Sequence, residues 1–491
     1  MGSRAAIVSP AALASLLLDH PFADAEPLLL SPSETVTAGE ARHEVHAIAD
    51  ALIAAGVKSG QAVAVQLPDG PRAIATMFAV WVAGAIFVPV NPRAPEPEVL
   101  HILDTTGAVA RVAVDGIAML PGSRTYEPGT AFVTWTSGTT GAPKPILHSH
   151  ASYVELLDRV VGSIRGDRRD DNARPTPNLI PVSLALNAGI YNVLFGLRVG
   201  AAIVVMDRFT TTGFATLVAR HGIQSTVLPP AAITMLADDP GVTALAPLRF
   251  VRSITAPLSP LQARRFIDKF GVVVLNGYGQ AEIGEVIGWS ARDAREHPEK
   301  LGALGRPHPG VDVKIVTDDG SPADDPDVIG RLFVRAPSMA RGDATNAAGA
   351  DLAARLDAEG YLDTGDLGRV DGDGFVWIEG RVSDLINRGG NKVYPDQVEE
   401  VLRLVPGVAE VAVVGASDAR LGEVPVAFVV EVDGATVADD DLRAVCRAHL
   451  APYKVPVAFH RIDALPRSEV GKVLRRELAG AAAEADRRDA T

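Results

Sequence analysis

The sequence predicts an α/β protein with a large N-terminal domain of wound mixed sheets flanked by helices, and a small C-terminal α+β domain. Three observations lead to this fold class. Helix-like and strand-like segments alternate in the first part of the chain, two strands run directly into glycine-rich turns, and the pattern changes beyond about residue 380. The chain of 491 residues also exceeds the usual domain of about 100 to 200 residues, so at least two folding units are expected.

The N-terminal part alternates helix and strand. Residues 47–55 are typical of a helix that ends before a glycine, and residues 62–67 are typical of a strand. Two further strands, 131–136 and 272–276, each lead into a glycine-rich turn. Open sheets bind ligands outside the carboxyl ends of their strands, so both turns become candidate sites.

The C-terminal part has a different pattern. Apolar residues recur at helical spacing over 396–405, after a proline that suits a helix start. Strand-like segments over 410–414 and 425–430 follow, and then a helix over 441–450. Together these elements predict a compact unit of about 110 residues, which is a normal domain size.

Composition and charge exclude several classes of function. The 60 acidic and 46 basic residues leave a net charge of −14, and no stripe of Lys and Arg interrupts the acidic excess, so nucleic acid is not an expected partner. The longest uncharged apolar run, 77–90, is shorter than the about 20 residues of a membrane span. Since Cys446 is the single cysteine, an intrachain disulfide is excluded, and we expect this residue to be structural. The absence of disulfides favours a reducing, cytoplasmic location for the protein.

The first glycine-rich turn, 136–144, concentrates hydroxyls, glycines and a lysine. Backbone N–H groups freed by glycine can form a concave anion site, to which the hydroxyls add donors and the lysine adds charge. The segment does not match the G-x-x-x-x-G-K-[ST] loop of common nucleotide hydrolases. Taken alone, it fits a surface loop as well as a phosphate site. The candidate phosphate-binding residues are Thr136, Ser137, Gly138, Thr139, Thr140, Gly141 and Lys144.

This turn resembles the signature phosphate loop of the adenylate-forming superfamily, which includes acyl-CoA synthetases, free-standing adenylation domains and beetle luciferases. The second turn, 276–282, is similar to the second core motif of that family. The resemblance implies that Tyr278 packs on adenine and that Glu282 holds Mg²⁺, a hard cation that prefers carboxylate oxygens. A solvated surface charge is the alternative for Glu282. The other nucleotide-binding residues implied in this motif are Asn276, Gly277, Gly279 and Gln280.

Three further segments match motifs of the same family. Residues 361–366 are similar to its ribose-binding motif, which implies that the two oxygens of Asp366 accept hydrogen bonds from the ribose diol. Arg381 matches the arginine that contacts the nucleotide, and Ser383 occupies the hinge position that follows. A turn residue and a surface ion pair are the alternatives for Asp366 and Arg381. The adenine-side turn is matched by Ala256 and Pro257.

The C-terminal segment 466–476 resembles the family motif whose lysine bridges the substrate carboxylate and the α-phosphate; that lysine is Lys472. A mobile point charge there suits two anions that must approach each other. The segment 388–395 matches the part of the family that swings in for the thiol step. The resemblance therefore implies a mobile lid, and we place the domains at 1–381 and 382–491. The implied catalytic residues are Lys472, Glu282 and Lys144.

The sequence departs from the family pattern at three positions. Ala281 stands where the family usually has a threonine, and Pro145 stands where it commonly has a glycine. Ser383 occupies the hinge position that is usually an aspartate or a lysine. The threonine hydroxyl is one donor to phosphate, worth about 0.5 to 1.5 kcal/mol, so ATP binding is expected to survive its loss. Pro145 stiffens the exit of the loop. Ser383 at the hinge is expected to change the relative stability of the orientations that the two domains adopt.

The acid-binding pocket is the least defined part. Residues 179–205 are mostly apolar, and Ser183, Asn187 and Tyr191 are the polar candidates there. Gly277, in the second glycine-rich turn, is a further candidate pocket residue. An apolar or aromatic acid fits this composition better than an amino acid does. Asn187 is equally compatible with a hydrogen-bonded core position.

The resemblance implies an AMP-forming acid–thiol ligase. Such an enzyme adenylates a carboxylic acid with ATP and Mg²⁺, then transfers the acyl group to a thiol, with coenzyme A as the leading acceptor. The alternatives are a stand-alone enzyme that loads an acyl carrier protein and an enzyme with a non-thiol acceptor, such as an ATP- and nitrite-dependent diazotising enzyme. A nucleotide-binding protein without catalysis is a third alternative, which the retained charged residues disfavour.

Overall fold

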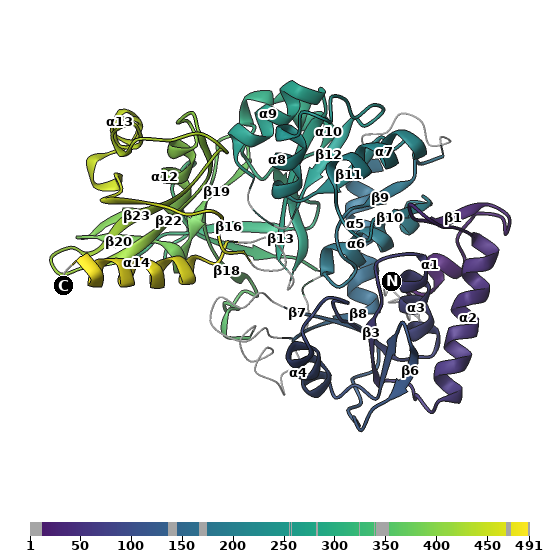
Figure 1. Cartoon of the computed structure of the whole chain (residues 1–491). Helices are drawn as coiled ribbons and strands as arrows, with labels where there is room; N and C mark the ends of the chain where they lie inside the picture. Colours follow the sequence, from purple (N-terminus) through teal and green to yellow (C-terminus); the bar gives the residue numbers. More distant parts are fainter. Residues whose placement is uncertain are drawn as a thin grey trace.

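The computed structural model describes residues 12–135, 145–165, 174–254, 256, 258–280, 283–323, 325–337, 339, 353–467 and 473–489. Within these residues the strands form four sheets. Figure 1 shows the yellow C-terminal elements at one end of the molecule, the purple N-terminal helices at the other, and the green strands between them. The arrangement confirms the predicted α/β class with two domains of unequal size.

The largest sheet has nine strands and is mixed. Its centre is parallel, and its two edges carry antiparallel strands. In spatial order the strands are β15 (Arg306–Pro307), β14 (Gly284–Gly288), β13 (Val273–Gln280), β12 (Phe250–Ser253), β11 (Ser225–Leu228), β9 (Asn178–Ile180), β10 (Ile203–Val205), β1 (Pro27–Leu30) and β2 (Thr35–Thr37).

The second sheet has six strands and is also mixed. Its last two strands pair antiparallel, with Trp135 opposite Pro145. The predicted phosphate loop therefore begins and ends at one sheet edge. In spatial order the strands are β6 (Gly116–Met119), β5 (Ala110–Ala113), β3 (Ala62–Gln66), β4 (Ile86–Pro89), β7 (Thr130–Trp135) and β8 (Pro145–Ser149).

Two smaller sheets complete the chain. An antiparallel sheet of four strands joins the large domain to the small one, and consists of β16 (Asp312–Val316), β17 (Gly330–Arg335), β18 (Leu362–Val370) and β19 (Val376–Arg381). The sheet of the small domain consists of β21 (Asn391–Val393), β20 (Ile386–Arg388), β23 (Gly422–Glu431) and β22 (Val408–Asp418), with β24 (Ala458–Arg461) paired to β23.

Helices connect the strands. The described helices of the large domain are α1 (Ser15–Leu18), α2 (Ala38–Ala54), α3 (Pro71–Val82), α4 (Glu96–Thr106), α5 (His150–Arg165), α6 (Asn187–Arg198), α7 (Thr211–His221), α8 (Pro230–Asp238), α9 (Pro260–Phe270) and α10 (Ala291–Glu296), with the 3₁₀ turn η1 (Pro298–Lys300). The small domain has α12 (Pro395–Leu402), α13 (Asp439–His449) and α14 (Arg475–Asp489), with η2 (Val382–Asp384) and η3 (Pro452–Lys454).

The predicted elements are confirmed in type, with shifted ends. The helix expected over 47–55 is the second half of α2, which begins earlier because Thr37 and Glu40 form a capping box. The helix expected over 396–405 already ends at Leu402. Both predicted strands of the small domain are longer, since β22 and β23 pair with each other along their length.

Each domain has its own hydrophobic core. The large domain is packed around buried aromatic residues that include Trp81, Phe78 and Phe132. The core of the small domain includes Val398 and the fully buried Cys446. Burial raises the pKa of the Cys446 thiol to about 11, which supports a structural role for this residue.

The last strand of the joining sheet ends at Arg381, and the sheet of the small domain begins at Ile386. We keep 381/382 as the proposed domain boundary. None of the described helices combines the length and the apolar character that crossing a membrane requires.

Candidate active site

A buried carboxylate lies at the centre of the candidate site. Asp366 is on β18 and is only 4% exposed. Its Cα is the register partner of Arg381 on β19, and the Arg381 Nε lies 3.1 Å from Asp366 Oδ1. Arg381, at the proposed domain boundary, is thus paired with the predicted ribose-binding residue. Arg381 itself is 40% exposed, so one side of the pair remains open.

Two residues of the second motif reach the same carboxylate from another sheet. The hydroxyl of Tyr278, on β13, donates to Asp366 Oδ2 at 2.6 Å. Gln280 Nε2 donates to the same oxygen at 3.0 Å and to the carbonyl of Thr364 at 2.8 Å. Burial and the charge of Asp366 raise the pKa of Tyr278 well above its usual value, so its phenol stays a donor. The structure therefore brings together Tyr278, Gln280, Asp366 and Arg381.

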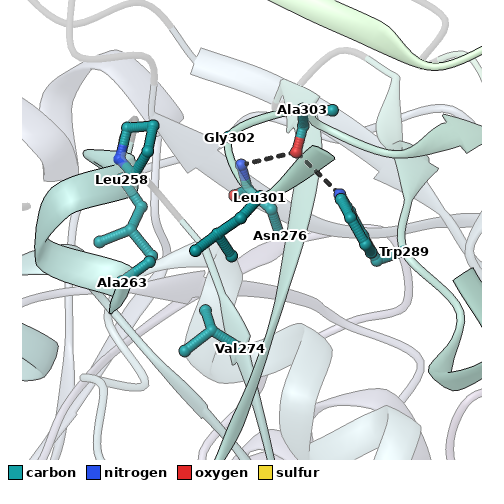
Figure 2. Close-up of a pocket in the computed structure, with 9 residues that line it drawn as sticks. Leu258, Ala263, Val274, Asn276, Trp289, Leu301, Gly302 and Ala303 are labelled. Atoms are coloured by element: carbon teal, nitrogen blue, oxygen red, sulfur yellow. Dashed lines mark hydrogen bonds between the residues drawn. The ribbon is translucent and has the colours of Figure 1, made fainter. Parts of the chain in front are cut away.

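Other residues of that motif shape the strand. Asn276 donates through Nδ2 to the carbonyl of Ala303 at 3.2 Å, beside the Trp289 indole, which donates to the same oxygen (Figure 2). The pocket beside them holds only about 10 Å³ of free volume, so it does not accommodate an adenine ring. A Cβ on Gly279 would lie 2.0 Å from the Gly284 carbonyl oxygen, so this glycine is required by the β13–β14 hairpin itself.

Two of the polar residues predicted for the acid pocket, Asn187 and Ser183, already have hydrogen-bond partners. Asn187 Oδ1 accepts a hydrogen bond from the Tyr153 hydroxyl at 2.8 Å, and Asn187 is partly exposed at the start of α6, so it stays a pocket candidate. Ser183 Oγ accepts from the Ala185 N–H at 3.2 Å. Burial and the charge of Glu285 raise the pKa of Tyr191 well above its usual value.

Several predicted residues lie outside the described part of the chain: Thr136, Ser137, Gly138, Thr139, Thr140, Gly141, Lys144, Pro257, Ala281, Glu282 and Lys472. Ala256 lies between β12 and α9. Among the described residues there is no group of three or more His, Cys, Asp or Glu side chains that could hold a metal ion. The Mg²⁺ ligand Glu282 stays a prediction.

A buried ionic cluster beside Gly277 was not predicted. Arg252 on β12 pairs with Glu285 on β14, and His308 Nε2 lies 3.1 Å from Glu285 Oε1. A Cβ built on Gly277 would lie 3.6 Å from Glu285 Oε1, so the cluster lies directly beside this predicted pocket residue. The charged residue inside the short apolar strand β12 was the only sequence signal, because the partners are far apart in the chain.

The charge of Glu285 is stabilised by its neighbours. Burial alone would raise the pKa of this carboxyl, but Arg252 and His308 outweigh burial and lower the pKa to about 2. An acid whose pKa is depressed on folding contributes stability above its ordinary pKa of 4.5, and that contribution is lost as the pH falls through about 2.

We therefore expect Glu285→Gln to lower the free energy of unfolding at pH 7 by about 3 kcal/mol, since Arg252 loses its buried counterion. The variant should also lose less stability than the wild type between pH 4.5 and 2. Urea unfolding at several pH values measures both effects. Glu296→Gln, which removes the exposed partner of Arg292, is the control and should change neither. Parallel pH curves for the wild type and Glu285→Gln would contradict the assignment.

With this geometry established, comparison with known proteins places the chain. Residues 21–128 and 121–342 match the AMP-binding enzyme family, and residues 397–472 match the AMP-binding enzyme C-terminal domain. A sulfoacetate–CoA ligase of Cupriavidus necator is 30% identical over 92% of this chain and 94% of its own length. A fatty acid–acyl-carrier-protein ligase of Streptomyces coeruleorubidus is 29% identical over 92% of each chain.

A similar solved structure is that of the amide bond synthetase McbA from Marinactinospora thermotolerans. It superposes with a TM-score of 0.82 at 26% identity, covering 96% of this chain and 99% of that one. The matches to the family extend over both domains and include β13, the strand that carries both Tyr278 and Gln280. The chain therefore belongs to the AMP-binding enzyme family of the adenylate-forming superfamily, and it is an adenylate-forming ligase.

Proposed function

We propose that the protein is an AMP-forming acid–thiol ligase, which adenylates a small carboxylic acid with ATP and transfers the acyl group to coenzyme A. The observation that carries the nucleotide half of this proposal is the convergence of Tyr278, Gln280 and Arg381 on the Asp366 carboxylate. The relative named a sulfoacetate–CoA ligase supports the thiol half.

The residues around Asp366 fit a ribose. A carboxylate has about four acceptor positions. Within the described chain, two hydrogen-bond donors occupy them, the Tyr278 hydroxyl and Gln280 Nε2, and Arg381 Nε adds an ion pair at 3.1 Å. Capacity for a hydroxyl of the ribose diol therefore remains, and the exposed side of Arg381 gives access to it. Asp366 and Arg381 would orient the nucleotide for attack at its α-phosphate.

The other roles follow from the family resemblance. Lys144 and the hydroxyls of the 136–144 turn would hold the leaving pyrophosphate, and Lys472 would stabilise the charge that develops as the carboxylate attacks. Glu282 would hold Mg²⁺, which when bound neutralises charge on the phosphate oxygens. The pairing of Trp135 with Pro145 supports a closed loop base for the phosphate site.

Rotation of the small domain, residues 382–491, about the hinge at Ser383 would start the second step. The described contacts between the two domains include polar side-chain pairs, and interfaces with such pairs allow domain movement more readily than large apolar ones do. These pairs include Ser259 Oγ to Glu400 Oε2 at 3.0 Å and Gln397 Nε2 to Glu379 Oε2 at 3.0 Å. In the segment expected to face the thiol, Gly389 and Gly390 take φ values of +57° and +87°, a left-handed conformation that favours glycine, and without side chains they leave the backbone open to a thin ligand arm.

Two other acceptors remain alternatives. The similarity to a relative named a fatty acid–acyl-carrier-protein ligase supports a carrier protein as the acceptor. The similarity to the amide bond synthetase supports an amine as the acceptor. The diazotising reaction with nitrite rests only on the departures at Ala281, Pro145 and Ser383.

The proposal predicts ATP–pyrophosphate exchange that depends on a carboxylic acid. We expect exchange with at least one acid of a panel that also contains amino acids and nitrite. Addition of coenzyme A to that reaction should yield AMP and an acyl-CoA, measured by mass spectrometry. A carrier protein and a primary amine, offered separately, are the controls for the acceptor.

The outcomes separate the alternatives. Exchange with nitrite alone would favour the diazotising enzyme. Product formation with only the carrier protein or only the amine would show that this compound, rather than coenzyme A, is the acceptor. No exchange with any compound of the panel would contradict the ligase proposal.

A second prediction concerns Lys472. Lys472→Ala should lower the rate of adenylation by about 10² to 10³, the size expected for one lost transition-state contact, and should leave thioester formation from supplied acyl-adenylate largely intact. Single-turnover measurements of the two half-reactions test this. Arg476→Ala, which removes an exposed cation four residues further on, is the control. Equal losses in both half-reactions would exclude the proposed role.

A further inference from the structure

The ionic cluster beside Gly277 stands where two elements of the predicted acid pocket meet. Arg252 is the register partner of Leu275, two residues before Gly277. Since alternate residues of a strand face the same side, Arg252 and Gly277 share one face of the sheet. Glu285, the counterion of Arg252, lies within 3.6 Å of the position that a Gly277 Cβ would occupy.

The helices on this side belong to the same region. Tyr191, on α6, lies near enough to Glu285 and Arg252 for the charges of both to shift the pKa of its phenol. Arg159, on α5, donates through Nη2 to the backbone carbonyl of Glu285 at 3.3 Å. An acid that lay against Gly277 and α6 would therefore meet Arg252 with the part of its body distant from the reacting carboxylate.

Arg252 has donors to spare. A guanidinium carries five N–H donors. Within the described part of the chain, Arg252 makes one hydrogen bond, to Glu285. Its side chain is 15% exposed, so the remaining donors lie at the margin of the accessible space rather than in the closed core. An alkyl group bound there would leave these donors without partners, which costs affinity.

The negative charge of Glu285 restricts which acids can bind beside Arg252. Glu285 stays ionised, because Arg252 and His308 lower its pKa to about 2, so the Arg252–Glu285 pair carries no net charge. Arg159 lies 3.8 Å from Glu155, a second balanced pair. A second anionic group on the acid would be attracted by the Arg252 guanidinium but repelled by the Glu285 carboxylate. A neutral acceptor, such as a hydroxyl or carbonyl oxygen, uses the free donors without that repulsion.

We propose that Arg252 determines substrate specificity by donating hydrogen bonds to a neutral polar group on the body of the acid, with Glu285 and His308 holding the guanidinium in place. The inference rests on the proposed ligase function and narrows its substrate class to acids with a distal hydroxyl or carbonyl group. It revises the expectation of a plainly apolar acid.

The test uses sets of acids matched in length. Benzoic, 4-hydroxybenzoic and terephthalic acid form one set; hexanoic, 6-hydroxyhexanoic and adipic acid form another. We measure kcat/KM for acid-dependent pyrophosphate release with the full-length protein. The wild type should favour the hydroxylated acid of at least one set by about 10-fold or more over both its hydrocarbon and its dianionic analogue.

Arg252→Met should reduce this preference to within about threefold, mainly through a higher KM for the hydroxylated acid, while release with the hydrocarbon acid persists. The double variant Arg252→Met/Glu285→Gln removes both charges together and guards against misfolding caused by one unpaired buried carboxylate. Arg265→Met, which removes the exposed partner of Asp238, is the matched control and should keep the wild-type preference.

The failures are distinguishable. Pyrophosphate release by the wild type that favours hydrocarbon or dianionic acids, or a preference that survives in both Arg252 variants, would overturn the role of Arg252 and leave the ligase function standing. No release with any acid would overturn the ligase function, and this inference with it.

Discussion

The polar contacts of Asp366 hold the candidate site together. This carboxylate on β18 accepts hydrogen bonds from Tyr278 and Gln280, at the end of the nine-stranded sheet, and forms an ion pair with Arg381 on β19, at the proposed domain boundary. A carboxylate that is only 4% exposed needs such donors, because a buried charge without partners is costly. The same bonds that satisfy the charge therefore fix the position of the nucleotide motif relative to the domain junction.

The sequence was informative where local rules govern the structure. Strands such as β3 and the two-domain division were predicted from periodicity and from the change in pattern near residue 380, and both are confirmed. Helix ends were less accurate, since the start of α2 depends on the capping pair Thr37 and Glu40 rather than on apolar spacing. The order of the strands could not be predicted from the sequence, because strands far apart in the chain pair with each other, as β1 does with β10.

The site divides in the same way. Motif resemblance identified Tyr278 and Asp366, but not that the phenol donates to the carboxylate, since 88 residues separate them. It also offered Asn187 as a pocket residue, but not the hydrogen bond that Asn187 accepts from Tyr153. Arg252 and Glu285 lie 33 residues apart on different strands, and only folding makes them neighbours. The residues proposed to select the acid are thus found by geometry, whereas the residues proposed to bind the nucleotide are found by pattern.

The central claim is that Asp366 accepts the ribose hydroxyls of the nucleotide, and calorimetric binding tests it most directly. ATP and 2′,3′-dideoxy-ATP are compared on the wild type and on Asp366→Ala. Removal of the hydroxyls should weaken binding to the wild type by about 10- to 100-fold, the size of charge-assisted hydrogen bonds, and should change binding to the variant by no more than about twofold. An equal penalty in both proteins would show that the ribose is held elsewhere.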